Sequence, residues 1–184
     1  MSEKPLRDWN VVVTLLQREL RDAWKFLQPF GQLSKSDYFN VLLMKVDDTG
    51  QFLDNMANAL QADRPLERVI NRIMPASVCF DFQRPAEFEA KLVEAVAPWV
   101  AQLAKGTFHV RMHRRGFKGR LSSQNEEQFL DGVLMKKLSA LGAATRIDFE
   151  DPDHIVDIET VGQRAGVALW TRDQAARYPF LKLD

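Results

Sequence analysis

The sequence has only one cysteine, Cys79, in 184 residues, and this scarcity excludes an internal disulfide. Cys79 lies inside the apolar run Val78-Cys79-Phe80, which favours a buried core thiol over a nucleophile. No stretch approaches the ~20 apolar residues that a membrane span needs, and no apolar run follows a basic head at the start. We therefore expect a cytoplasmic protein without a membrane association.

The common catalytic motifs are also missing. There is no nucleophile elbow, P-loop or dinucleotide fingerprint, and Gly116-Phe117-Lys118-Gly119 is too short for a phosphate loop of the GxxxxGK type. The three histidines stand in charged segments, and the serines stand at turns and helix caps. Because no constellation meets the geometric roles that a catalytic site demands, we expect a protein that is not an enzyme and needs no cofactor.

What the sequence does contain is typical of a globular protein. Hydrophobic residues make up 46% of it and charged residues 27%, which argues against extended disorder. A single core usually serves roughly 100 to 150 residues, so a chain of this length suits two small domains that share an interface.

Charge is balanced overall but separated along the chain. Lysine and arginine number 25 and aspartate and glutamate also number 25, so the net charge gives no hint of a nucleic-acid partner. Segment 105–120 contains no acid, and its basic residues are Lys105, His109, Arg111, His113, Arg114, Arg115, Lys118 and Arg120. Segment 148–159 contains no lysine or arginine, and its acids are Asp148, Glu150, Asp151, Asp153, Asp157 and Glu159.

The first half alternates between strand and helix patterns. They predict, in order, a buried strand at 11–16, a helix at about 19–27, a hairpin of strands at 31–36 and 38–46, and a helix from Asp47 or Asp48 to about Leu60, followed by a break at Arg64-Pro65. Segment 66–74 fits both a helical face and strand alternation. As a strand it completes a β-α-β-β-α-β order, the ferredoxin-like arrangement with two helices on one face of an antiparallel sheet.

The second half predicts a helix at about 86–103, kinked at Pro98, and then a strand with two unlike faces. Phe108, Val110 and Met112 face the core, whereas the alternate positions between 109 and 115 are basic. A capping box at Ser123 and Glu126 begins a helix that Gly142 ends. Short strands at 146–150, 155–161 and 165–170 and a short tail helix follow, and Asp151-Pro152-Asp153 suits a turn in which an aspartate accepts backbone hydrogen bonds.

The basic strand and the loop after it form the first candidate site. A row of His and Arg on one face, continued by a Gly-rich basic loop, can meet successive phosphates without base-specific contacts. The structural alternative is a solvated face paired with the acids of 148–159. If His109 and His113 are neutral at pH 7, affinity for phosphate groups should rise modestly on acidification.

The acidic segment offers oxygen donors and His154, of the kind that bind metals. Its spacing does not match an EF-hand or a histidine pair on a helix. Alternation along 156–159 instead predicts that Asp157 and Glu159 form an exposed sheet face, so we expect no metal site.

The order of motifs in the second half resembles that of THUMP domains. The matching segments are the strand and loop Thr107-Phe108-His109-Val110-Arg111 through Gly119, the Ser-capped helix, the run Ile147-Asp148-Phe149-Glu150-Asp151-Pro152-Asp153-His154-Ile155-Val156-Asp157-Ile158-Glu159, and then Gly162 with Ala165-Gly166-Val167. Upstream, Arg68-Val69-Ile70-Asn71-Arg72-Ile73-Met74-Pro75 resembles the segment before this module in stand-alone THUMP proteins such as the adaptor for tRNA cytidine acetylation.

The resemblance implies an α/β (α+β) protein with a ferredoxin-like domain at 1–75 and a THUMP RNA-binding domain at 76–184, with the boundary inside 63–85. It further implies docking of the tRNA acceptor end as an accessory to a separate tRNA-modifying enzyme, because the chain ends at Asp184 without a catalytic domain. The expected RNA contacts are Arg68, Arg72, His109, Arg111, His113, Arg114, Arg115, Lys118, Arg120, Lys136 and Lys137. The rival hypotheses are a metal-assisted hydrolase that uses the acidic strands and an adaptor that binds only protein.

Overall fold

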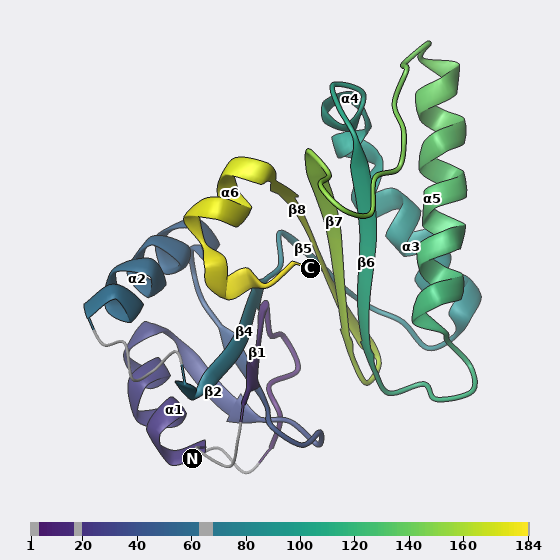
Figure 1. Ribbon diagram of the computed structural model, residues 1–184. Helices are drawn as coiled ribbons and strands as arrows, with labels where there is room; N and C mark the ends of the chain where they lie inside the picture. The colour runs from purple at the N-terminus through teal and green to yellow at the C-terminus, as the bar shows by residue number, and fades with distance from the viewer. Residues whose placement is uncertain (1–3, 17–19, 63–67, 184) are drawn as a thin grey trace. The chain divides into compact units, whose positions relative to one another are not determined.

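The computed structural model describes residues 4–16, 20–62 and 68–183, which form two compact units (Figure 1). Unit 1 comprises residues 1–77 and 175–182, and unit 2 comprises residues 78–174 with Leu183. The change of unit after Ser77 lies inside the predicted range of 63–85, but the tail 175–182, which the sequence assigned to the second domain, groups with unit 1. Glu19, the break at Arg64-Pro65 and Leu66 lie outside the described residues.

Unit 1 is a four-stranded antiparallel sheet with two helices. Its elements are β1 (Val11–Leu15), α1 (Leu20–Leu27), the 3-10 turn η1 (Gln28–Phe30), β2 (Gln32–Lys35), β3 (Val41–Lys45), α2 (Thr49–Ala62), β4 (Ile70–Pro75) and, in the tail, η4 (Pro179–Leu181). The strands lie in the order β2-β3-β1-β4. This is the β-α-β-β-α-β order that the sequence predicted, and the ambiguous segment 66–74 is a strand from Ile70 onward.

The core of unit 1 lies between one face of this sheet and both helices. Val11, Val13 and Leu15 alternate along β1 on that face, and they pack in one buried cluster with side chains from α1 and α2, namely Ala23, Leu27, Phe52 and Met56. α2 begins where Asp48 Oδ1 accepts a hydrogen bond from the Gln51 amide at 2.9 Å, the cap that the sequence predicted.

Unit 2 is a second four-stranded sheet, covered on one face by helices. Its elements are β5 (Val78–Asp81), α3 (Pro85–Val96), η3 (Ala97–Trp99), α4 (Val100–Leu103), β6 (Phe108–Arg115), α5 (Ser123–Ala140), β7 (His154–Val161), β8 (Arg164–Thr171) and the first residues of α6 (Arg172–Arg177). The strands lie in the order β5-β8-β7-β6, and β6 runs parallel to β7. The predicted helix at 86–103 is interrupted around Pro98, as expected.

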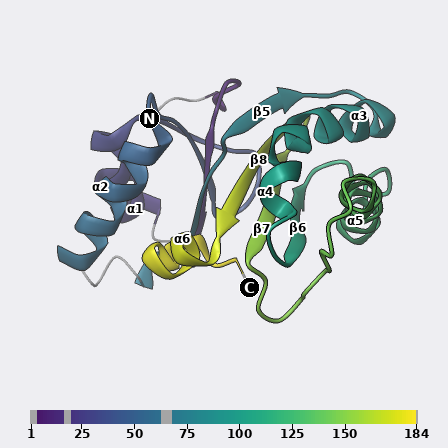
Figure 2. The same cartoon turned by 90° about the horizontal axis from the view of Figure 1, so that it is seen from above.

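The helix-covered face of unit 2 holds its core. Phe108, Val110 and Met112 are buried there, as predicted, together with Phe88 and Leu92 of α3 and with Leu130 and Leu134 of α5. Figure 2 shows α3 and α5 on the same side of β6, β7 and β8. No helix among the described residues is long and apolar enough to cross a membrane.

Three local predictions differ from the structure. α5 is capped one residue earlier than expected, because Ser122 Oγ accepts from the Asn125 amide at 3.4 Å. Segment 146–150 is not a strand: only Ile147 bridges to β6, since the chain turns at Asp148 immediately afterwards. Cys79 is partly exposed rather than buried, because β5 is an edge strand and the neighbouring Phe80 takes the core face.

Replacing Met56 by alanine tests the core of unit 1. Met56 is fully buried between α2 and the sheet, so Met56→Ala should lower the free energy of unfolding by about 2–5 kcal/mol through lost burial and the cavity left behind. Asn58→Ala, an exposed position of the same helix, should change it by less than about 0.5 kcal/mol. Urea unfolding followed by circular dichroism measures both, and equal stabilities would contradict this packing.

Candidate nucleic-acid interface

β6 is an edge strand of unit 2 and places the basic and acidic segments of the sequence side by side. Its parallel register sets Arg111 opposite Asp157, His113 opposite Glu159 and Arg115 opposite Val161. Paired positions of neighbouring strands point to the same face of a sheet, here the face opposite the helices. The two segments of opposite charge therefore share one sheet face.

One cation of β6, Arg115, is paired with an acid of the same unit. The Arg115 guanidinium forms an ion pair with the Glu159 carboxylate, and their side chains are 18% and 1% exposed. Asp157 is also fully buried. The prediction that Asp157 and Glu159 form an exposed acidic face is therefore wrong, and the structural alternative of pairing between the two segments holds for Arg115.

His109, a predicted RNA contact, is also buried. It is 8% exposed, and its ring meets the Phe149 ring edge-on at 5.0 Å between centroids. Burial lowers the pKa of His109, and the nearby positive charge of Arg111 lowers it further. His109 is therefore mostly neutral at pH 7 and is buried, which argues against its predicted role as a phosphate contact.

The loop after β6 is folded tightly onto the core. Gly116, Phe117 and Gly119 have positive φ angles of 98°, 52° and 76°, and the backbone amides of Arg120 and Leu121 both donate to the Phe117 carbonyl. The Phe117 ring packs on Phe82 with 5.0 Å between centroids. An aromatic anchor thus fixes this loop beside the segment that precedes α3.

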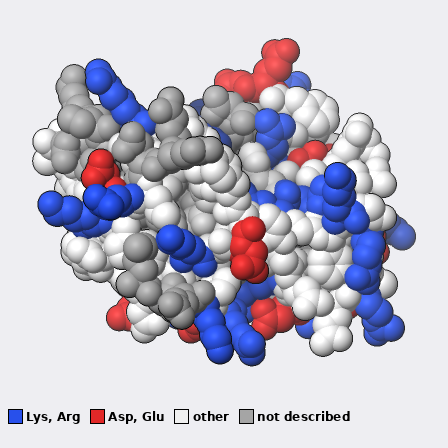
Figure 3. Space-filling view, turned by 90° about the horizontal axis from the view of Figure 1, so that it is seen from below, with Lys and Arg blue, Asp and Glu red and all other residues white. Residues whose placement is uncertain are grey.

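Cations gather around this loop. The Arg120 guanidinium lies over the Phe117 ring at 4.6 Å, and its Nη2 donates to the Gln83 carbonyl at 3.3 Å. Arg114 Nη1 donates to the Gly116 carbonyl, and Lys118 is exposed at the tip. Next to Gln83 stands Arg84, which is also exposed. We call Arg84, Arg114, Lys118 and Arg120 the basic end of unit 2. In the space-filling view from below, Lys and Arg side chains stand among uncharged residues and some acids (Figure 3).

Two helices begin at the basic end. α3 has Arg84 as its N-cap residue and α5 has Ser122, so the positive ends of both helix dipoles add to the field of the cations. Backbone amides of a helix's first turn have no partners within the helix and favour anions. Cations and helix starts together make this surface suited to binding phosphate groups.

The acids near the basic end weaken its field only partly. Glu87 accepts from Lys91 Nζ at 2.6 Å, and the hydrogen bonds from Lys91 and from the Gln83 amide lower the pKa of Glu87. Burial raises the pKa of Glu126 to about 7, with a smaller contribution from the charge of Glu89. Glu126 therefore carries a full negative charge only above neutral pH.

Other predicted contacts lie away from the basic end. Lys136 and Lys137 are exposed in the last turns of α5, and a rise of about 1.5 Å per residue puts them ~20 Å along the axis from the helix start. Arg68 is exposed in unit 1. Arg72, also in unit 1, is only 5% exposed, and its Nε donates to the Leu181 carbonyl at 2.9 Å, so it has a structural role.

Sequence reasoning missed Arg84. It stands 30 residues before Arg114, and its segment is brought to the loop by the packing of Phe117 on Phe82 and by the hydrogen bond from Arg120 to Gln83. The Arg84-Pro85 pair did mark a helix start, which is a signal for anion binding when other cations are near.

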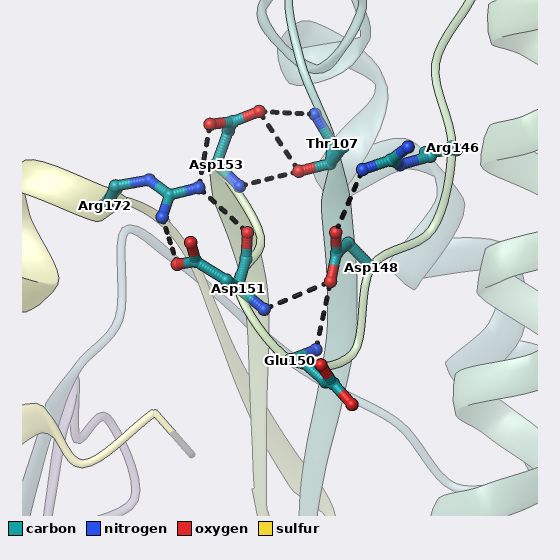
Figure 4. A network of polar contacts seen from close by, with 7 residues as sticks. All are labelled: Thr107, Arg146, Asp148, Glu150, Asp151, Asp153 and Arg172. Atoms are coloured by element: carbon teal, nitrogen blue, oxygen red, sulfur yellow. Dashed lines mark hydrogen bonds and ion pairs between the residues drawn. The ribbon is translucent and has the colours of Figure 1, made fainter.

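The Asp151-Pro152-Asp153 turn is held by a network of hydrogen bonds and ion pairs (Figure 4). Asp148 Oδ1 accepts from the amides of Glu150 and Asp151 at 3.1 Å, as predicted for an aspartate in this turn. Asp153 Oδ2 accepts from the Thr107 amide at 2.8 Å, and Arg172 pairs with both Asp151 and Asp153. These acids are engaged by protein donors, and the described residues contain no group of three or more His, Cys, Asp or Glu placed to hold a metal.

The comparisons with known proteins identify the fold. No model of a protein family matches the chain, and no curated protein matches it either. Among solved structures, PH1313 from Pyrococcus horikoshii Ot3 aligns with a TM-score of 0.56 at 14% identity over 88% of this chain and 54% of its own. TrmN from Thermus thermophilus aligns with a TM-score of 0.57 at 18% identity over 88% and 44%.

A third structure, a 4-thiouridine synthetase–RNA complex with bound ATP, aligns with a TM-score of 0.50 at 13% identity over 87% of this chain and 40% of its own. The chain thus spans about half of the first structure and less than half of the other two. At these identities the likeness establishes the fold alone, and it supports the α+β, THUMP-like fold that the sequence resemblance implied.

The buried carboxyl of Glu126 predicts a pH-dependent stability. Its pKa in the folded protein lies above the ordinary value, so the unfolding free energy falls as the pH rises through about 4.5 to 7, where only the unfolded chain loses the proton. Glu126→Gln mimics the protonated form and should melt at a higher temperature than the unchanged protein at pH 8, but at the same temperature at pH 4. Glu94→Gln, exposed on α3, should show no such difference; a pH-independent effect of Glu126→Gln would contradict the assignment.

The Asp153 carboxylate predicts the opposite dependence. The Thr107 amide, followed by Arg172, lowers its pKa to about 2, so its stabilisation is complete above about pH 4 and is lost as the pH falls through 2. Asp153→Ala should lower the melting temperature at pH 7, and the difference from the unchanged protein should shrink toward pH 2. Glu150→Ala in the same turn, whose side chain points away from the network in Figure 4, is the matched control.

Proposed function

We propose that the chain binds folded RNA, with the acceptor end of tRNA as its preferred target, and serves as a non-catalytic accessory to a separate tRNA-modifying enzyme. The observation that carries this proposal is the basic end of unit 2. Four cations stand there around one anchored loop, at the point where α3 and α5 begin.

This arrangement suits phosphates rather than bases. Arg and Lys side chains with helix-start amides neutralise backbone phosphates and position an RNA without reading its sequence. Structured RNA is generally recognised by shape and backbone in this manner. The loop is held by Phe117 and Phe82, so binding should cost little ordering of the protein.

The choice of tRNA and of an accessory role rests on similarity. The motif order resembles THUMP domains, and the fold is like that of TrmN and of a 4-thiouridine synthetase whose structure contains RNA. Arg111 and His113, which are half-buried on the face of β6 opposite the helices, remain predicted RNA contacts outside the basic end. The hydrolase hypothesis is weakened, because Asp153 is occupied by Thr107 and Arg172.

Charge reversal at the basic end tests the proposal. Arg84→Glu with Lys118→Glu should weaken tRNA binding at least about tenfold and flatten the slope of log K against log salt by about one for each lost phosphate contact. The two residues that hold the Phe117 ring, Phe82 and Arg120, are unchanged in this variant, so the loop should stay folded. The measurement is a gel-shift titration at several salt concentrations, with tRNA that keeps or lacks its single-stranded acceptor end.

The matched control is Arg21→Glu with Lys25→Glu, which reverses two exposed charges on α1 of unit 1 at positions outside the predicted RNA contacts. If both double variants weaken binding equally, the effect is one of net charge and the basic end is not the site. Equal affinity for the two forms of tRNA would contradict the acceptor-end preference. No tRNA binding at low salt would favour the adaptor that binds only protein.

A further inference from the structure

Unit 1 contains a cavity of about 350 Å³ whose lining includes no residue of the basic end. It lies between the end of α2, the start of β4 and the chain's tail, and its lining includes Leu60, Gln61, Asn71, Arg177, Phe180 and Lys182. All of these residues belong to unit 1. The volume falls within the range of about 300–1,000 Å³ that is usual for small-molecule sites.

The wall that the tail contributes is held in place from two sides. Tyr178 Oη donates to Asp54 Oδ1 of α2 at 2.6 Å, and the buried Arg72 of β4 donates from Nε to the Leu181 carbonyl at 2.9 Å. Between them, Phe180 is partly buried and packs against the core of unit 1. The tail wall of the cavity is therefore held in place without a ligand, which reduces the ordering cost of binding.

The polar side chains of the cavity are cations and amides. Lys182 Nζ donates to Asn71 Oδ1 at 2.9 Å, which leaves the amide nitrogen of Asn71 as a donor. Lys182 has a left-handed backbone with a φ of 41°, a strained conformation for a residue with a side chain, and such strain clusters at ligand sites. Arg177 is held by Asp54 at 2.8 Å. The lining residues that the structure describes include no acid.

A partly buried ring beside two cations and two amides suits a flat, anionic ligand. Aromatic side chains stack on nucleobases, lysine and arginine bind phosphate, and amides pair with the edges of bases. We propose that this cavity binds a nucleotide, with its base against Phe180 and its phosphate between Arg177 and Lys182. The nucleotide is either a free mononucleotide or an unpaired nucleotide of a bound RNA, and the second source rests on the proposed function.

Ligand-observed NMR with adenosine 5′-monophosphate as the probe tests the chemistry on the full chain. The monophosphate should bind, whereas adenosine and inorganic phosphate, which each lack one half of the ligand, should bind at least about tenfold more weakly. Lys182→Gln should weaken monophosphate binding by a similar factor. Phe180→Leu keeps an apolar side chain against the core and should reduce binding by loss of stacking. Lys25→Gln, exposed on α1 and outside the lining, is the matched control.

A second arm distinguishes the two sources. If the ligand is an unpaired RNA nucleotide, Lys182→Gln should weaken binding of tRNA that keeps its single-stranded end and leave trimmed tRNA unaffected. The proposal is overturned if the monophosphate binds Lys182→Gln as tightly as the unchanged protein, or if it does not bind and the variant affects neither RNA. The Arg84→Glu and Lys118→Glu double variant should retain monophosphate binding, so failure at the basic end is separable from failure here.

Discussion

The reciprocal hydrogen bonds between Thr107 and Asp153 hold the start of β6 against the start of β7, and the architecture of unit 2 depends on that clamp. Asp153 accepts from the Thr107 amide and hydroxyl, while the Asp153 amide donates to Thr107 Oγ1. The close approach requires Gly106, where a Cβ atom would stand 2.5 Å from Asp153 Oδ2. A slip of one residue in this register would turn every core side chain of β6 to the opposite face. The clamp therefore decides that Phe108 is buried and that Arg115 meets Glu159.

Once the register of β6 is fixed, the packing of Phe117 holds the basic residues after β6 together on one surface. Its ring packs on Phe82, and the Arg120 guanidinium lies over the Phe117 ring and donates to the Gln83 carbonyl. Cations from two distant parts of the chain then meet the starts of two helices. Like charges so gathered repel one another in the free protein, and an anionic partner relieves that repulsion, which is why such clusters indicate binding rather than stability.

Much of the fold could be predicted from local patterns. The alternation of apolar and basic residues predicted the core positions of β6, and the Asp48 cap predicted the start of α2. The turn at Asp148 was predicted because aspartate side chains often accept backbone hydrogen bonds in turns. The site was predicted less well, since charge along the chain does not reveal pairing across strands. Three predicted contacts are engaged in tertiary interactions instead. Arg115 forms an ion pair with Glu159, the buried His109 contacts the Phe149 ring, and Arg72 donates a hydrogen bond to the Leu181 carbonyl in the tail. Arg84 escaped notice for the same reason, because its neighbours are remote in sequence.

The net charge of the chain is zero, but the cations that the structure describes are of two kinds: some are paired with carboxylates and others are not. Arg115, Arg164 and Arg172 are bound to carboxylates within unit 2 and contribute little field at a distance. Among the other cations of unit 2, the basic end and the pair Lys136 and Lys137 lie some 20 Å apart along α5 by helix geometry. At physiological ionic strength the Debye length is about 8 Å, so these two groups act independently on a ligand. A small anion interacts with only one of them, whereas a ligand that contacts both must span about 20 Å, as a folded RNA does.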